Sequence, residues 1–193
     1  MSIAELPRRK MTAEEFLALP DDGVERWLIR GELRENGNID MNRRNPDHSG
    51  VMTSVAEFLG AWVRKRPQPR GKVYTGDASF KLRASSLSLV GIDVAYVSAE
   101  LRAKTPKGRR VVEGVPILAV EILSPSDVHA DWTEKVQEYL DVGVALVWIV
   151  DPDFETVTVY RPDAEPVSFN KQQELTAEPH LPGFRVSVAE LFD

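Results

Sequence analysis

Two acidic residues and one lysine stand where side chains of their type could do hydrolytic chemistry. Glu121 is the one charged residue in the apolar run 117–123, and Asp93 opens another apolar run, 93–97. Burying an ionised carboxylate is costly unless it is paired or bound to a metal. Two carboxylates that converge on one point repel each other, so they favour a divalent cation between them. Lys135 follows on the next predicted helix, where its ammonium could position a water nucleophile and stabilise a charged phosphorane-like transition state.

Each of these residues also has a plain structural interpretation. Glu121 could form a buried salt bridge or face solvent at a sheet edge. Asp93 could be an ordinary turn residue at the start of a strand. Lys135 could be a solvated lysine paired with Asp131, which lies four residues earlier on the same side of the helix. Residue type and spacing leave these alternatives open.

The pattern around Glu121 predicts the elements that carry the three side chains. The run 117–123 is apolar almost throughout, which is typical of a central strand covered on both faces. A helix is expected over about 131–142, with Lys135 and Tyr139 on one side and Gly143 as its stop. A second buried strand follows at 145–150, so the unit is a strand–helix–strand crossover.

The upstream sequence adds helices and strands to this unit. Thr12 and Glu15 form a capping-box pattern that predicts a short helix ending at Pro20. The run 25–35 predicts a hairpin that turns at Gly31. A longer helix should begin near Asp47 or Ser49, with an apolar face formed by Val51, Val55, Phe58, Leu59 and Trp62. Further strands are expected at 71–75, 78–82, 92–97 and 156–160, with a loop at 100–114.

This order of elements favours one α/β (α+β) domain, a mixed central sheet flanked by helices. We expect it to span 1–193, with 1–20 as an N-terminal helical lead-in and 161–193 as a C-terminal extension. The longest apolar stretch, 142–150, is well short of the ~20 residues that a bilayer requires. Because no apolar segment follows Arg8–Lys10, we expect no secretory signal and a cytoplasmic protein without membrane contact.

Composition narrows the chemistry of any metal site. The chain of 193 residues has no cysteine, which excludes thiol nucleophiles, iron–sulfur clusters and cysteine zinc sites. Its three histidines, His48, His129 and His180, are scattered singly. Oxygen ligands are therefore expected, and these suit Mg²⁺ or Mn²⁺. His48, at the start of the long helix, could touch the site or a phosphate, or could be a plain helix-start residue.

Basic residues gather in two short segments although the net charge is −6. That net charge excludes an overall cationic nucleic-acid binder but not a local basic surface. Both segments lack acidic residues and are expected in loops, where they could contact a DNA backbone or simply be solvated. Their cations are Arg64, Lys65, Arg66, Arg70 and Lys72 in the first segment, and Arg102, Lys104, Lys107, Arg109 and Arg110 in the second.

Several motifs together resemble a known bacterial family. They read IDVAYV at 92–97, LAVEILSPS at 118–126, Asp131-x3-Lys135-x3-Tyr139-x3-Gly143-Val, and VWIVDP at 147–152. Weaker matches run from MTAEEF at 11–16 through IRGEL at 29–33 and His48 to LPGF at 181–184. The chain resembles the Uma-type putative restriction endonuclease family of the PD-(D/E)XK nuclease superfamily over nearly its whole length.

The resemblance implies a restriction-endonuclease-like core that binds Mg²⁺ or Mn²⁺. Asp93 would match the signature aspartate and Glu121 the second acidic ligand, with the backbone carbonyl of Ile122 as a further ligand. Leu123 stands where the superfamily usually has its lysine, and Lys135 on the next helix would take that part. Glu32 of the Gly-Glu-Leu motif is implied as a supporting acid, as is Asp77.

Two functions are therefore expected to compete. The first is a metal-dependent endonuclease acting on DNA, with a homodimer favoured because cutting two strands suits a two-fold partner. The second is a catalytically impaired binding or regulatory module that keeps the nuclease fold. It is favoured by the net negative charge and by Arg26-Trp27, which stand where the family commonly has a tyrosine–glutamate pair and so remove one carboxylate. A hydrolase of small phosphoesters is a third interpretation.

Overall fold

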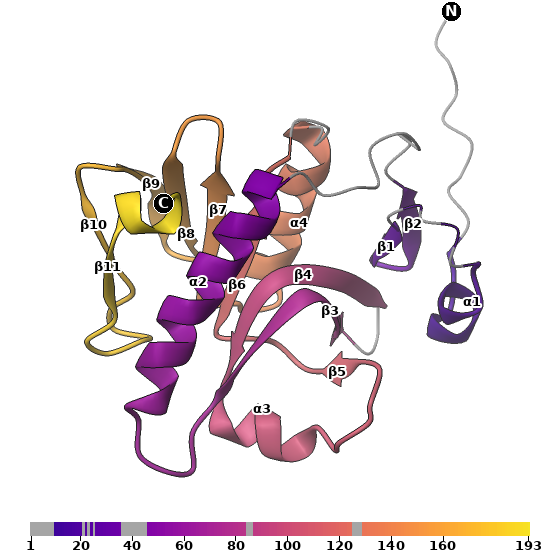
Figure 1. Cartoon of the computed structure of the whole chain (residues 1–193). Coiled ribbons are helices and arrows are strands. Elements are labelled where there is room, and N and C mark those ends of the chain that lie inside the picture. The colour runs from indigo at the N-terminus through magenta and orange to yellow at the C-terminus, as the bar shows by residue number, and fades with distance from the viewer. Residues whose placement is uncertain are drawn as a thin grey trace, which may run out of the picture.

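A mixed β-sheet forms the centre of the molecule in a computed structural model (Figure 1), which describes residues 10–20, 22, 24, 26–35, 46–83, 87–124 and 129–193. The strand order is β2-β1-β4-β6-β7-β8-β9, and β3 pairs with both β4 and β5. The strands are β1 (Arg26–Ile29), β2 (Glu32–Glu35), β3 (Lys72–Arg83), β4 (Ser88–Val97), β5 (Val112–Glu113), β6 (Leu118–Ile122), β7 (Leu146–Asp151), β8 (Thr156–Arg161) and β9 (Ala164–Asn170).

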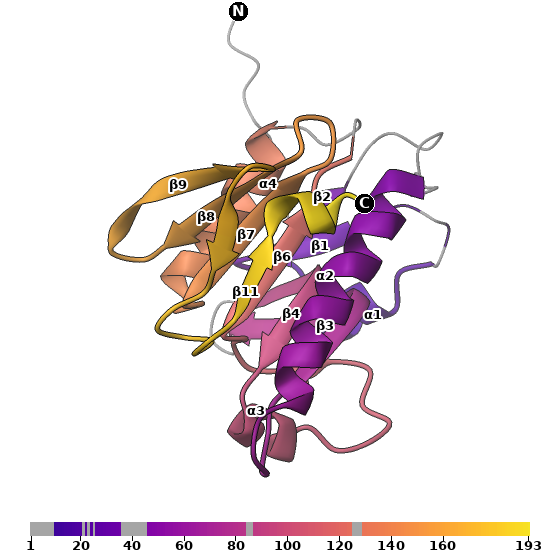
Figure 2. The same cartoon turned by 60° about the vertical axis from the view of Figure 1, so that its left-hand side comes forward.

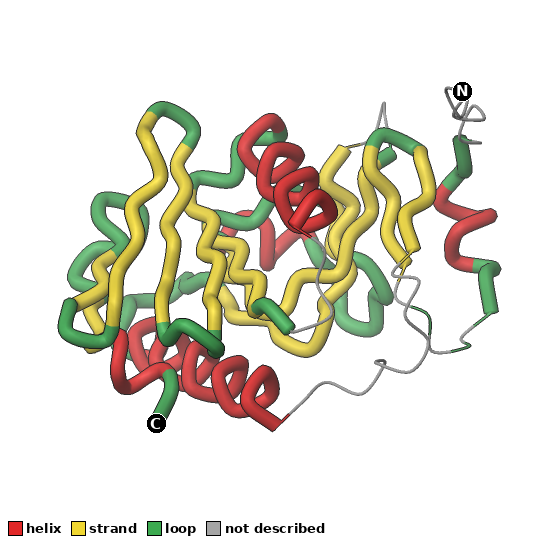
Figure 3. Tube along the Cα trace, turned by 90° about the horizontal axis from the view of Figure 1, so that it is seen from above, coloured by secondary structure: helices red, strands yellow, loops and turns green. Residues whose placement is uncertain are grey.

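Two long helices cover opposite faces of this sheet, as the view from above shows (Figure 3). Helix α2 (Pro46–Arg64) packs on one face, and α4 (His129–Asp141) packs on the other as the crossover between the parallel strands β6 and β7. The shorter helices are α1 (Ala13–Leu17), α3 (Ala99–Lys104) and the 3₁₀ turn η2 (Val188–Leu191). The predicted α/β (α+β) architecture, a mixed sheet flanked by helices, is confirmed.

Each face of the sheet has its own apolar core. On the α2 face, Val55 and Leu59 pack against Val120 and Trp148. On the α4 face, Val136 and Tyr139 pack against neighbours that include Ala119, Val147 and Ile149. Alternate residues of β6 enter the two cores, because side chains along a strand point to opposite faces. Glu121 shares the parity of Ala119, which places it on the side of α4.

The segment 161–193 completes the core on the α2 face. β9 adds an edge strand to the main sheet, while β10 (Glu174–Thr176) and β11 (Arg185–Ser187) form a separate two-stranded sheet. Leu175, Leu181 and Phe184 are buried in the core beneath α2, and the Trp62 indole donates a hydrogen bond to the carbonyl of Pro182. Figure 2 shows β11 and the 3₁₀ turn lying beside α2.

Most predicted elements are confirmed, and two segments differ. Thr12 caps α1 with the complete capping box, and the β1–β2 hairpin turns through Arg30 and Gly31, both at positive φ. The segments 71–75 and 78–82 belong to one strand, β3, because a β-bulge between Thr75 and Ala78 interrupts the ladder without ending it. The expected loop at 100–114 holds most of α3, with Ser98 as its N-cap, and β5.

Two sequence-based expectations involve residues that the structure does not describe. Residues 1–9 of the N-terminal lead-in, and Pro125 and Ser126 after β6, lie outside the described residues. Among the residues that the structure describes, no helix is long and apolar enough to cross a membrane.

Candidate metal and catalytic site

Asp93 and Glu121 lie on neighbouring strands at the same end of their pairing. β4 and β6 are antiparallel, and the last residues that pair are Val94 and Val120. Asp93 precedes Val94 and Glu121 follows Val120, so both acids lie just beyond this pair. The Asp93 Oδ2 atom accepts a hydrogen bond of 2.8 Å from the backbone N–H of Ile122, the residue after Glu121. Both side chains are buried, with exposed fractions of 5% for Asp93 and 8% for Glu121. The structure therefore brings the two predicted acids to one place.

A β-bulge in β3 lies opposite Asp93. The ladder between β3 and β4 steps from Thr75↔Val94 to Ala78↔Ile92, so Gly76 and Asp77 together face Asp93. Both bulge residues have positive φ, 76° at Gly76 and 53° at Asp77. Bulges bend a strand and redirect side chains, and they are frequent beside active sites. β6 continues to pair with β7 through Ile122, and the Asp93 carboxylate satisfies the Ile122 N–H on the other edge of β6.

Helix α2 contributes His48 to the same carboxylate. The His48 Nε2 atom lies 3.3 Å from Asp93 Oδ2, and His48 has an exposed fraction of only 5%. Of its two interpretations from sequence, contact with the site is the one that the structure shows. His48 and the Ile122 N–H together fix the orientation of one carboxylate oxygen of Asp93.

Lys135 reaches Glu121 from α4. The Lys135 Nζ atom lies 3.7 Å from Glu121 Oε2, and Lys135 has an exposed fraction of 8%, so it is not the solvated lysine of the plain interpretation. Tyr139, one turn further along α4, donates its hydroxyl to Glu121 Oε1. The predicted sharing of one helix side by Lys135 and Tyr139 is thus confirmed, and both oxygens of Glu121 face α4.

The β1–β2 hairpin supplies a further contact to Lys135. The Trp27 ring is 3% exposed, and the Lys135 ammonium lies 4.7 Å from its centroid. From the sequence, Trp27 was notable only because it stands where the family commonly has a glutamate, so that one carboxylate is missing. The structure shows the lysine ammonium over the aromatic ring of Trp27, in a cation–π contact.

Glu32, which the resemblance implies as a supporting acid, is engaged within the hairpin. Its Oε2 atom is 3.2 Å from the guanidinium of Arg34. Arg34 in turn makes a bidentate pair with Glu134 on α4, at 2.6 and 2.7 Å, and the hydrogen bonds to Glu134 raise the pKa of Arg34. These contacts link Glu32, through the Arg34 side chain, to Glu134, the residue that precedes Lys135.

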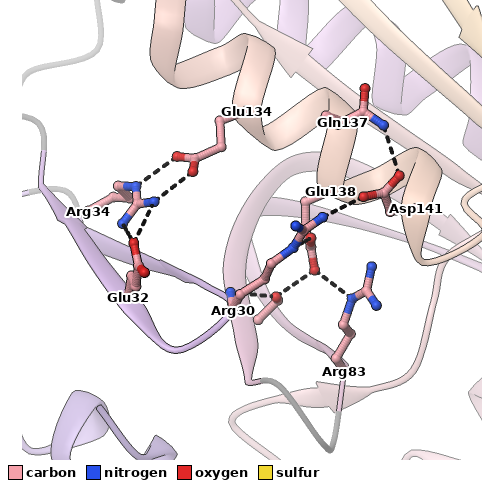
Figure 4. A network of polar contacts seen from close by, with 9 residues as sticks. Arg30, Glu32, Arg34, Arg83, Glu134, Gln137, Glu138 and Asp141 are labelled. Atoms are coloured by element: carbon pink, nitrogen blue, oxygen red, sulfur yellow. Dashed lines mark hydrogen bonds and ion pairs between the residues drawn. The ribbon is translucent and has the colours of Figure 1, made fainter. Parts of the chain in front are cut away.

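Glu138 is a buried carboxylate that sequence reasoning missed (Figure 4). With 1% exposure, it accepts hydrogen bonds from Arg30 Nε (3.1 Å), Arg83 Nε (2.8 Å) and Ser88 Oγ (2.6 Å). The hydrogen bond to Glu138 is also the main cause that raises the pKa of Arg30. Because its cations come from the hairpin and β3, nothing local in the helix sequence distinguishes Glu138 from a solvated glutamate.

The chemistry of the donors fits a hard divalent cation. Asp93 and Glu121 offer buried carboxylate oxygens, and Mg²⁺ typically takes one or two carboxylates together with water and substrate phosphate. Within the described ranges, no group of three or more His, Asp or Glu side chains is arranged to hold a metal ion. A cation here would therefore depend on these two acids, a backbone carbonyl and groups from solvent or substrate.

The two basic segments come together at the far end of α2. The Arg102 guanidinium donates to the carbonyl of Arg70 at 3.1 Å, which joins the segments into one surface. Arg64 stands sixteen residues after His48 in α2, so this surface begins about 24 Å from the acidic site along the helix.

Some of these cations already have internal partners. The Arg66 guanidinium lies over the Trp62 ring and donates to Pro182, and Lys104 pairs with Glu100. Lys65, Lys107, Arg109 and Arg110 are exposed. We call the ten cations of 64–72 and 102–110 the basic surface.

Comparisons with known proteins agree with this architecture. A family model described as "Uma2: Putative restriction endonuclease" matches residues 13–189. The solved structures that are similar include a protein described as a putative nuclease belonging to DUF820, from Anabaena variabilis ATCC 29413. Its TM-score is 0.77 at 22% sequence identity, over 94% of this chain and 97% of that one, which shows a shared fold. No curated protein matches the chain.

Proposed function

The chain belongs to the Uma2 family of putative restriction endonucleases, and from this premise we propose that it is a metal-dependent endonuclease that hydrolyses phosphodiester bonds of DNA. One observation carries the proposal: two buried carboxylates lie on adjacent strands at the end of their pairing, and one of them contacts a buried lysine. Asp93 is held at the Ile122 N–H, and Glu121 lies 3.7 Å from the Lys135 ammonium. Charges buried this deeply are costly, so a site that uses them is favoured over a chance arrangement.

Asp93, Glu121 and the Ile122 carbonyl are the groups that would hold Mg²⁺ or Mn²⁺. The N–H and C=O of one residue in an extended strand point to the same side. The Ile122 carbonyl therefore faces the edge of β6 from which Asp93 approaches. A cation bound there would lower the pKa of its water and offset charge on the scissile phosphate.

Lys135 would act on the reacting groups directly. Its ammonium lies 3.7 Å from Glu121 Oε2 and carries three hydrogen-bond donors. There it can hold a water molecule by hydrogen bonding and stabilise the extra negative charge of the pentacoordinate phosphorus. Tyr139 and His48 would act through their partners: the Tyr139 hydroxyl orients Glu121, and the His48 imidazole orients Asp93. Glu32 would assist at longer range, by holding Arg34 against Glu134.

DNA is the proposed substrate, and the basic surface is the proposed backbone contact. Its distance of about 24 Å from the acidic site means that a duplex would reach both only if it ran along the molecule. We keep a homodimer as part of the proposal, because cleavage of both strands suits a two-fold arrangement. A cytoplasmic location also stays a prediction.

One observation favours the second candidate, a binding module without catalysis. Glu121 already contacts Lys135 and receives the Tyr139 hydroxyl, so the cluster is partly compensated before any metal enters. In that case Asp93, Glu121 and Lys135 would form a buried charge cluster that stabilises the fold. The candidates differ in whether the two acids bind a divalent cation.

Cleavage of a supercoiled plasmid tests the proposal. The wild-type protein should nick or linearise the plasmid with Mg²⁺ or Mn²⁺ and not with EDTA. The Glu121→Gln and Lys135→Met variants, which keep side-chain volume, should cut far more slowly. A wild type that cuts no faster than these variants would support the binding module instead. Cleavage of simple phosphodiesters but not of DNA would support the small-phosphoester hydrolase.

A further inference from the structure

Trp27 and Arg34 are paired across the β1–β2 hairpin and reach two consecutive residues of α4. They are direct partners in the antiparallel register, so their side chains share one face of the hairpin. Arg34 binds Glu134 through two hydrogen bonds, and the Trp27 ring lies 4.7 Å from the Lys135 ammonium. The hairpin therefore holds α4 at the turn that carries the proposed catalytic lysine.

The aromatic ring holds the lysine in a different way from a carboxylate. The negative face of an indole attracts an ammonium without accepting its hydrogen bonds as an oxygen would, and without cancelling its charge. The Glu121 Oε2 atom lies 3.7 Å from the same amine. With Trp27 in place of a second acid, the local charge beside Lys135 stays more positive.

We infer that Trp27 is a positioning residue that holds the Lys135 ammonium at Glu121 while preserving its positive charge for the substrate. The catalytic part of this inference rests on the proposed function. The ordering of the Lys135 side chain by Trp27 is independent of that function. The Trp27 ring is 3% exposed and lies beside Arg34, which binds α4, so the ring is held against this helix. On this account Trp27 contributes to the site by positioning Lys135.

Three substitutions separate the possible contributions of Trp27. Trp27→Phe keeps an aromatic face, Trp27→Leu keeps apolar bulk without one, and Trp27→Glu adds a carboxylate. Trp148→Phe is the matched control, because Trp148 is an equally buried tryptophan in the core on the opposite face of the sheet. Melting temperatures show which variants fold.

The first measurement is the ¹³C relaxation order parameter of the Lys135 ε-methylene in the full chain. We expect an ordered methylene in wild type, Trp27→Phe and Trp148→Phe, and a mobile one in Trp27→Leu. If the mobility came from a general loss of packing, the Lys135 side chain would be mobile in Trp148→Phe as well as in Trp27→Leu. A Lys135 side chain that is equally ordered in Trp27→Leu and wild type would overturn the inference, whether or not the protein cuts DNA.

The second measurement is single-turnover cleavage, with DNA affinity measured separately. We expect Trp27→Phe to cleave within about threefold of wild type, and Trp27→Leu and Trp27→Glu to lose about 10- to 100-fold in the chemical step at unchanged DNA affinity. Wild-type cleavage with no difference in Trp27→Leu would refute the catalytic part of the inference. Absence of wild-type cleavage would instead refute the proposed function, and the relaxation measurement would still decide on Trp27.

Discussion

Asp93 accepts a hydrogen bond from the backbone N–H of Ile122, the residue that directly follows Glu121. This contact ties the first acid to the strand that carries the second, across the edge where β4 and β6 stop pairing. His48 holds the same Asp93 oxygen from α2, so elements on both sides of the sheet converge here. The site is therefore built by the central strands, with the helices supplying orientation.

Neutral isosteres of the two acids should abolish metal-dependent activity while the fold persists. Asp93→Asn and Glu121→Gln keep side-chain shape and remove the charge that attracts Mn²⁺. We expect Mn²⁺ affinity and plasmid cleavage each to fall at least about 100-fold, because loss of outer ligands alone costs 10–100-fold. Calorimetric titration and the cleavage assay measure the two effects. Unchanged Mn²⁺ affinity in both variants would argue that the acids serve only the fold.

Lys135 should behave differently from the acids. Lys135→Met removes a cation that lies 3.7 Å from Glu121, so Mn²⁺ affinity should stay equal or rise. The cleavage rate should still fall by about 10²–10³, the usual cost of losing one donor to a charged transition state. Lys171→Met, an exposed lysine paired with Glu155, is the control and should change neither quantity. Loss of Mn²⁺ binding in Lys135→Met would mean that the lysine organises the site and does not act in the chemistry.

Much of the site was predictable because its signals are local. An acid in an apolar strand stands out by its desolvation cost alone, which identifies Glu121. Lys135 and Tyr139 follow from helical spacing, since residues four apart share a helix side. Asp93 needed the resemblance to separate it from a turn residue, because a strand-start aspartate is common.

The remaining features depend on contacts between distant segments. Glu138 looks like a solvated helix residue until Arg30 and Arg83 reach it from other elements. The two strands predicted at 71–75 and 78–82 form one strand with a bulge at Gly76 and Asp77. The hydrophobic pattern could not show this, because it does not report the pairing register between strands. The basic segments were expected in loops, where they could contact DNA or be solvated, but sequence could not show that Arg102 donates to the Arg70 carbonyl and joins them into one surface.

The Glu138 network should show an asymmetry in stability. Replacing both Arg30 and Arg83 by Met leaves a carboxylate of 1% exposure with the Ser88 hydroxyl as its donor, which should clearly lower the free energy of unfolding, because a buried carboxylate that loses its cations is costly. Glu138→Leu leaves two arginines that are 55% and 31% exposed and can be hydrated, so its cost should be smaller. Urea denaturation compares the two. A larger loss in Glu138→Leu would contradict this view of the network.

The basic surface should control the salt dependence of DNA binding. Each phosphate contact adds about 0.9 to the slope of log K against log salt, so a triple Lys107→Gln, Arg109→Gln and Arg110→Gln variant should lose up to about 2.7. Lys171→Gln is the control for charge alone. An unchanged slope on a long duplex would remove these residues from the interface.

The central claim is that Asp93 and Glu121 share a divalent cation. Anomalous diffraction from a crystal soaked in Mn²⁺ tests it most directly. The account predicts one strong peak within coordination distance of a carboxylate oxygen from each of the two residues and of the Ile122 carbonyl, and no such peak in a Glu121→Gln crystal. A fully soaked wild-type crystal with manganese elsewhere, and with the Lys135 ammonium still in contact with both Glu121 and Trp27, would contradict it.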